Sequence, residues 1–153
     1  MATGNALELF GAYIQEDRRR IPALGLFPYH SVRDMEHRHN SMFLGTFGGM
    51  KIVGTRSQFS FSYGELPHPF LQVTGGIGMN PEAKTEGVHY RNFFATYLLG
   101  PFLVLNPLFT MYLLEKLGYT GPLAFQREAM EAYTYRLREL ERPGVRFQMG
   151  EHG

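Results

Sequence analysis

Between Met42 and Leu99 the apolar residues come in short runs that glycines and prolines interrupt. Short runs bounded by such residues are typical of β-strands joined by tight turns. The composition agrees, because the chain holds 18 Gly and 9 Pro together with 13 Phe. The sequence therefore predicts many tight turns between short buried elements, and it argues against a helical bundle.

Five segments of this region are predicted strands: residues 43–47, 51–53, 58–63, 70–74 and 93–99. Gly48-Gly49 separates the first two. The third alternates strictly, which places Phe59, Phe61 and Tyr63 on one face. We interpret that face as core and the alternating serines as the outward face. The last run is almost continuously apolar, as expected for a strand covered on both faces.

Helices are predicted at the two ends of the chain. Residues 6–14 have helical spacing, with Asn5 or Thr3 as the cap. A charged turn over 15–20 and an irregular apolar stretch over 21–27 follow. Near the other end, Asn106-Pro107 is a start signal for a helix over 108–117, which Gly118 ends. A second helix over about 122–140 carries an apolar stripe, and the last ten residues are expected to fray.

Composition excludes several classes of function. At 153 residues the chain is expected to form one domain. It has no Cys, so it can hold no disulfide, thiolate metal site or Cys nucleophile. A formal net charge of +1 argues against nucleic acid as the main partner. No apolar run is long enough to span a membrane, and the first residues lack the blocks of a signal peptide, so we expect a cytoplasmic protein.

Three local patterns invite a chemical interpretation, and each has a simpler one. Gly75-Gly76-Ile77-Gly78 fits no phosphate-loop spacing, which favours a tight turn. His37 and His39 would share one face of a strand, but two ligands do not make a metal site. Serines 57, 60 and 62 lie in no nucleophile elbow and have no paired base. We therefore predict no metal and no cofactor.

The stretch from Glu86 to Pro107 is informative as a unit. It begins Glu-Gly-Val, continues into a strand that ends Thr-Tyr-Leu-Leu-Gly-Pro, and closes with Asn-Pro at the start of a helix. In order and spacing it resembles the C-terminal signature of the class I glutamine amidotransferases of the cobyric acid synthase (CobB/CobQ) type, above all the amidotransferase subunits of lipid II isoglutaminyl synthases. Ile21–Leu26, Lys51–Gly54 and the segment from Asn5 to Gly11 resemble further parts of that family.

The resemblance implies an α/β fold, namely the C-terminal portion of a flavodoxin-like class I glutamine amidotransferase sheet flanked by helices. It also implies the family's role, which is to hydrolyse glutamine and pass ammonia to a synthetase partner. On this basis residues 1–140 are a partial glutamine amidotransferase-like domain, and residues 141–153 are a frayed C-terminal tail.

The departures from the family's pattern concern its chemistry. The family's nucleophilic Cys corresponds to Gly4, and the His that activates it corresponds to Leu99. Both halves of the nucleophile–base pair are therefore missing. The family's Glu-Asn-His-Ser-Gly-Arg-Thr loop is also absent, while Arg38 matches an Arg near the family's glutamine site. Thr3 and His89 are the candidates for relocated catalytic residues.

These departures predict a degenerate, non-catalytic protein that keeps the family scaffold. The family's first strands would precede Gly4, so we expect a partial domain: a fragment, half of a split protein, a subunit that needs a partner, or a chain whose start is placed too far downstream. The expected partner is a protein, either a ligase subunit or the missing N-terminal half. Two alternatives stay open: a binding or scaffold subunit that completes its sheet with another chain, and an active glutaminase subunit with relocated residues.

Overall fold

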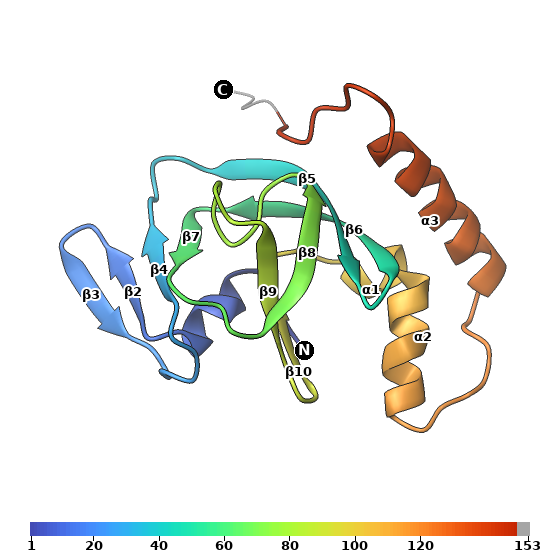
Figure 1. Ribbon diagram of the computed structural model, residues 1–153, viewed down its shortest axis with the longest axis horizontal. Helices are drawn as coiled ribbons and strands as arrows, with labels where there is room; N and C mark the ends of the chain where they lie inside the picture. The colour runs from blue at the N-terminus through green and yellow to red at the C-terminus, as the bar shows by residue number, and fades with distance from the viewer. Residues whose placement is uncertain (150–153) are drawn as a thin grey trace.

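In the computed structural model, which describes residues 1–149, the strands form two curled sheets with few helices beside them (Figure 1). The larger sheet has the strand order β1 (Ala2–Thr3), β10 (Phe93–Thr96), β9 (Thr85–Tyr90), β8 (Pro69–Gly75), β5 (His39–Phe47) and β6 (Met50–Gln58). The smaller sheet has the order β3 (Arg19–Pro22), β2 (Tyr13–Glu16), β4 (His30–Arg33) and β7 (Ser60–Tyr63). The protein is thus of the mixed α/β type.

Most neighbouring strands in both sheets run antiparallel; β1 is parallel to β10, and β2 is parallel to β4. Residues 1–149 therefore form mixed sheets in which antiparallel pairs predominate. The reason lies in the short connections. Gly48 and Gly49 both have positive φ and join β5 to β6, as a two-residue hairpin turn requires. Such a turn cannot make the long crossover that parallel neighbours need.

The α-helices pack on one face of the six-stranded sheet. They are α1 (Phe102–Leu105), α2 (Pro107–Lys116) and α3 (Gln126–Leu140), and Figure 1 shows them together at one side of the molecule. Phe102 of α1 and Phe109 of α2 bury their rings against Phe70 and Phe94 of the sheet. Tyr133 and Leu140, from the apolar stripe predicted for the last helix, pack with β5 and β6.

The opposite face of β10 is covered by a 3₁₀ helix, η1 (Gly4–Phe10), and its neighbours. Ala95 packs there in a cluster with Leu7, while the adjacent Phe94 packs on the α-helical side. Strand β10 is therefore buried on both faces, as its apolar sequence predicted. It ends at Thr96 rather than at Leu99, which leaves residues 97–99 to turn toward β6.

The helix predicted over residues 6–14 is shorter and of a different type. It is a 3₁₀ helix that ends at Phe10, and Thr3 at its N-cap makes no side-chain capping bond. Gly11 lies so close to Tyr29 that a Cβ atom would sit 2.7 Å from the tyrosine carbonyl oxygen. The chain then enters β2, so residues 15–20, predicted as a solvated turn, belong mostly to the β2–β3 hairpin.

The two faces predicted for residues 58–63 are reversed. Ser60 and Ser62 are 1% exposed, whereas Tyr63 is 39% exposed. The reason is that the inner face of the smaller sheet is polar: the Ser62 hydroxyl bonds to the hydroxyls of Ser31 and Tyr97, at 2.8 and 2.7 Å. On the outer face the Tyr63 ring lies 6.2 Å from the ring of His30. Serine side chains satisfy this buried polar environment and phenyl rings would not.

Two predictions about the C-terminal region need adjustment. Asn106 precedes α2 as predicted, but its side chain makes no capping bond. Its side-chain oxygen instead accepts from the N–H of Val53 and its side-chain nitrogen donates to the carbonyl of Val53, each at 2.8 Å.

Helix α3 begins at Gln126, later than predicted. In the described part of the predicted tail, the Phe147 carbonyl accepts from the N–H of Met42 and the Met149 N–H donates to Asn40; residues 150–153 lie outside the described residues.

Candidate functional site

The candidate site is the turn between β1 and η1. Gly4 begins η1 with a φ of +63°, a backbone conformation that glycine adopts without steric cost. A sharp strand-to-helix turn with a strained first residue is the geometry that presents a nucleophile in several hydrolase folds. Gly4 is buried, and it carries no side chain to present.

The end of β10 brings a second residue to this turn. Because Ala2 and Thr3 pair in parallel register with Ala95 and Thr96, the chain leaves both strands at the same end of the sheet. A Cβ atom built on Gly4 would lie 3.0 Å from Cδ2 of Leu99. The structure therefore brings together the two positions, Gly4 and Leu99, that the sequence singled out.

Leu99 is held at this position by a backbone bond. Its N–H donates to the carbonyl of Thr55 on β6 at 2.9 Å, and the residue is half-buried. An alkyl side chain neither accepts nor donates a proton. The two facing positions, Gly4 and Leu99, thus hold neither a nucleophile nor a base.

Thr3 lies beside the turn in a different surrounding. It is exposed and lines a shallow hollow of about 320 Å³ together with residues 100–104 and Met1. None of the side chains that line this hollow is titratable. His89, the other relocated candidate, stacks on Phe94 at 4.3 Å and its Nε2 bonds to the carbonyl of Arg91 at 2.9 Å. No contact among the described residues links His89 to Thr3.

A buried polar cluster, which sequence reasoning missed, lies behind the turn. The Glu8 carboxylate of η1 has no exposed surface; it accepts from Arg33 at 2.9 Å and from the Ser60 hydroxyl. The bond to Glu8 raises the pKa of Arg33. Burial, and then the Glu8 charge, raises the pKa of Tyr97 to about 12. The sequence signal that could have indicated this cluster is Glu8 itself, a carboxylate between two leucines in an apolar helix pattern.

A second buried ion pair joins β6 to β9. Arg56 Nη2 lies 3.4 Å from Glu86 Oε1, and both side chains are fully buried. Burial lowers the pKa of Arg56 and raises that of Glu86. Hydrogen bonds hold the pair: Thr96 Oγ1 and the Tyr97 N–H donate to Glu86, and Arg56 Nη1 donates to the carbonyls of Ile77 and Gly78. The Gly75–Gly78 loop thus turns carbonyls toward a cation, which an anion-binding loop would not do.

The remaining sequence candidates lie apart from the turn. Arg38 is exposed, and its guanidinium carbon lies 4.7 Å from the centre of the Phe59 ring. His37 pairs with Asp34 at 2.8 Å, and His39 bonds to Ser41 at 2.9 Å, so the two histidines serve different contacts. Within residues 1–149, no group of three or more metal-ligating His, Cys, Asp or Glu side chains occurs.

The fold defines a class: a mixed α/β domain in which a short strand leads into a 3₁₀ helix at a turn where Gly4 faces Leu99. No model of a protein family matches the sequence. The chain is, however, similar to two curated proteins named lipid II isoglutaminyl synthase (glutamine-hydrolyzing) subunit GatD. It is 36% identical over 109 residues to that of Staphylococcus aureus and 31% identical over 114 residues to that of Streptococcus pneumoniae.

These matches cover 68% and 69% of this chain but 42% of each relative, so the chain spans less than half the length of the curated relatives it matches. The similarity fits a glutamine amidotransferase-like domain and agrees with the resemblance read from residues 86–107. Among the described residues, no helix is both long enough and apolar enough to cross a membrane.

Proposed function

We propose that this chain is a glutamine amidotransferase-like subunit of an amidating ligase that has lost glutamine hydrolysis. In this proposal the scaffold is the C-terminal part of a class I amidotransferase domain of the cobyric acid synthase type. Gly4 occupies the place of the nucleophile and Leu99 the place of the base. The partner is a protein, a ligase subunit that amidates a cell-wall precursor, and the location is cytoplasmic.

The observation that carries the proposal is the approach of Gly4 to Leu99. The resemblance matches each of these residues to a member of one catalytic pair. They are 95 positions apart in the chain, yet a Cβ atom built on Gly4 would lie 3.0 Å from Cδ2 of Leu99. Glutamine hydrolysis in this family's manner needs a thiolate and a proton carrier at those positions. A glycine and a leucine supply neither, so the chain keeps the geometry of the pair without its chemistry.

Glutamine hydrolysis by the purified chain tests the proposal. We expect release of glutamate and ammonia at the rate of the protein-free blank, both for the chain alone and with a ligase partner added. Hydrolysis above that blank, abolished by Thr3→Ala or His89→Ala, would support an active subunit with relocated residues instead.

A second candidate function, a binding or scaffold subunit, is favoured by the edge of the larger sheet. Strand β1 is at that edge, with β10 as its neighbour on one side. An edge strand presents unpaired backbone groups on which another chain can add a strand. Co-purification of a stoichiometric second protein would support this function, and a stable monodisperse monomer would count against it.

A further inference from the structure

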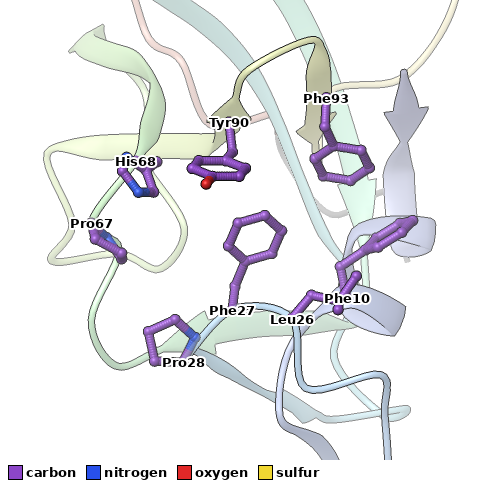
Figure 2. Close-up of a pocket in the computed structure, with 8 residues that line it drawn as sticks. All are labelled: Phe10, Leu26, Phe27, Pro28, Pro67, His68, Tyr90 and Phe93. Carbon is purple, nitrogen blue, oxygen red and sulfur yellow. The ribbon is translucent and has the colours of Figure 1, made fainter.

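An apolar pocket lies away from the Gly4 turn, and neither function above uses it. It has a volume of about 550 Å³ and opens between η1, the 26–28 segment, the 67–68 segment and the β9–β10 hairpin (Figure 2). Cavities of about 300–1,000 Å³ with mostly apolar walls are typical of small-molecule sites. The size of this pocket therefore suits a small organic ligand.

The walls consist of two groups of rings. On one side Phe10, Phe27 and Phe93 are in contact, with ring centres 4.6 Å apart for Phe10–Phe93 and 5.8 Å apart for Phe27–Phe93. On the other side the His68 and Tyr90 rings lie 4.9 Å apart. Among the described residues no ring contact joins the two groups, and Figure 2 shows the Phe27 ring in the middle of the pocket side chains, below Tyr90. Exposed aromatic rings favour an aromatic ligand, because ring pairs gain energy beyond the area that they bury.

The polar atoms of the pocket lie on one side. The Tyr90 hydroxyl and the His68 ring nitrogens make no hydrogen bond within the described residues, and Tyr90 is 42% exposed. No Asp, Glu, Lys or Arg lines the cavity. The Arg91 guanidinium lies beyond this lining, with its carbon 5.3 Å from the centre of the Tyr90 ring, so an ionic ligand would lose its hydration here without a counter-charge in the lining. An uncharged ligand with one hydroxyl or N–H group would gain a bond to Tyr90 or His68.

We propose that this pocket binds an uncharged, planar aromatic small molecule, which packs against the rings of the Phe10–Phe27–Phe93 group and of the His68–Tyr90 group and turns a polar substituent toward Tyr90. This goes beyond the proposed amidotransferase-like function, because the pocket contains neither Gly4 nor Leu99. Failure of the pocket proposal would leave the outcome of the glutamine assay unchanged. Glutamine hydrolysis by the chain would likewise leave the binding test unchanged.

The test uses N-phenylnaphthylamine, an uncharged aromatic amine whose fluorescence rises in apolar surroundings. The chain has no Trp, so intrinsic emission interferes little. We expect saturable binding of one molecule per chain, displaced by indole or phenol. Leu26→Glu, at a residue of the pocket that is 65% exposed, is expected to weaken binding at least about tenfold by placing a charge at the entrance. Tyr90→Phe is expected to weaken it about threefold.

Leu117→Glu is the matched control, because Leu117 is 82% exposed and lies at the end of α2, outside the pocket. It should leave the affinity unchanged. The proposal is overturned if the chain shows no saturable binding, or if the two glutamate variants bind alike. It is also overturned in its small-molecule form if only a peptide with an aromatic side chain displaces the probe, since the occupant would then be a partner protein.

Discussion

Cδ2 of Leu99 lies 3.0 Å from the position that a Cβ atom on Gly4 would occupy, although 94 residues separate Gly4 and Leu99 in the chain. The parallel register of β1 and β10 creates this approach, because it carries both chain segments past the same end of the sheet. The left-handed φ of Gly4 turns the chain sharply at that point. The relationship is therefore a property of the backbone, and side chains introduced at the two positions would face each other.

The first prediction concerns a thiol placed at this turn. Gly4→Cys introduces the chain's single Cys, and a thiol without a charged neighbour is mostly protonated at pH 6.5, because free Cys has a pKa of about 8.5. Adding Leu99→His places an imidazole beside it, and an imidazolium stabilises the thiolate. We expect alkylation by iodoacetamide at pH 6.5 to be roughly tenfold faster in the double variant.

The control for this prediction is Gly4→Cys combined with Leu117→His, which puts the imidazole on the distant end of α2. Its alkylation should match that of Gly4→Cys alone at each pH. Equal pH profiles for the two double variants would mean that residues 4 and 99 do not face each other in solution.

The second prediction concerns the Glu8 carboxylate. Glu8→Ala removes the buried partner of Arg33 and Ser60, while Arg33 keeps Glu16 at 3.3 Å, and this should lower the free energy of unfolding by about 2 kcal/mol. This loss of stability is smaller than for a fully buried ion pair, because the Arg33 side chain keeps 25% of its surface in water. Urea denaturation measures the change. Glu128→Ala, which breaks an exposed pair with Arg127, should change stability by less than about 0.5 kcal/mol, and similar losses in both variants would contradict the account.

The third prediction is an alkaline loss of stability through Tyr97. Its pKa is raised from 10.0 to about 12 by burial and by Glu8, so the folded state binds this proton more tightly than the unfolded state. The contribution, about 3 kcal/mol, is complete below pH 10 and is lost as pH rises toward 12. The Tyr97→Phe variant should be less stable than the unmodified chain at pH 8, because it lacks the hydrogen bonds of the Tyr97 hydroxyl. Its free energy of unfolding should fall less steeply above pH 10.

Tyr63→Phe is the control for this prediction, because Tyr63 lies on the outward face and is 39% exposed. Its stability should fall between pH 10 and 12 as steeply as that of the unmodified chain. A decline in Tyr97→Phe as steep as in Tyr63→Phe would assign the alkaline transition to other groups.

The fourth prediction separates two roles for Asn106. Asn106→Ser preserves a good N-cap residue but cannot join both the N–H and the carbonyl of Val53. Because Asn106 is 1% exposed, the lost bonds leave buried backbone groups unsatisfied, and we expect a loss of about 2–3 kcal/mol in thermal or urea unfolding. A change below about 0.5 kcal/mol would mean that capping is the main role of this side chain.

The sequence predicted those parts of the fold that local chemistry determines. The hairpin at Gly48-Gly49, the end of α2 near Gly118 and the packing of Tyr133 and Leu140 all follow from turn residues or from helical spacing. The positions of Gly4 and Leu99 came from the resemblance, and the structure brings them together.

The parts that were wrong depend on contacts distant in the sequence. The alternation over residues 58–63 gives two faces but does not say which one is buried, and Ser31 and Tyr97 decide this from other strands. Likewise, nothing near Glu8 in the sequence indicates that Arg33 pairs with its carboxylate in the interior and that the Ser60 hydroxyl donates to it. Nor does the start signal at Asn106 show that its side chain binds Val53 on β6. Periodicity reports spacing, whereas burial of polar groups is decided by their tertiary partners.

We propose that the Gly4–Leu99 turn keeps the geometry of a catalytic pair and lacks its chemistry. Glutamate release from glutamine by the purified, unmodified chain at neutral pH tests it most directly. We expect a rate equal to that of the protein-free blank. A rate that exceeds the blank, rises in proportion to protein concentration and co-elutes with the chain would contradict it.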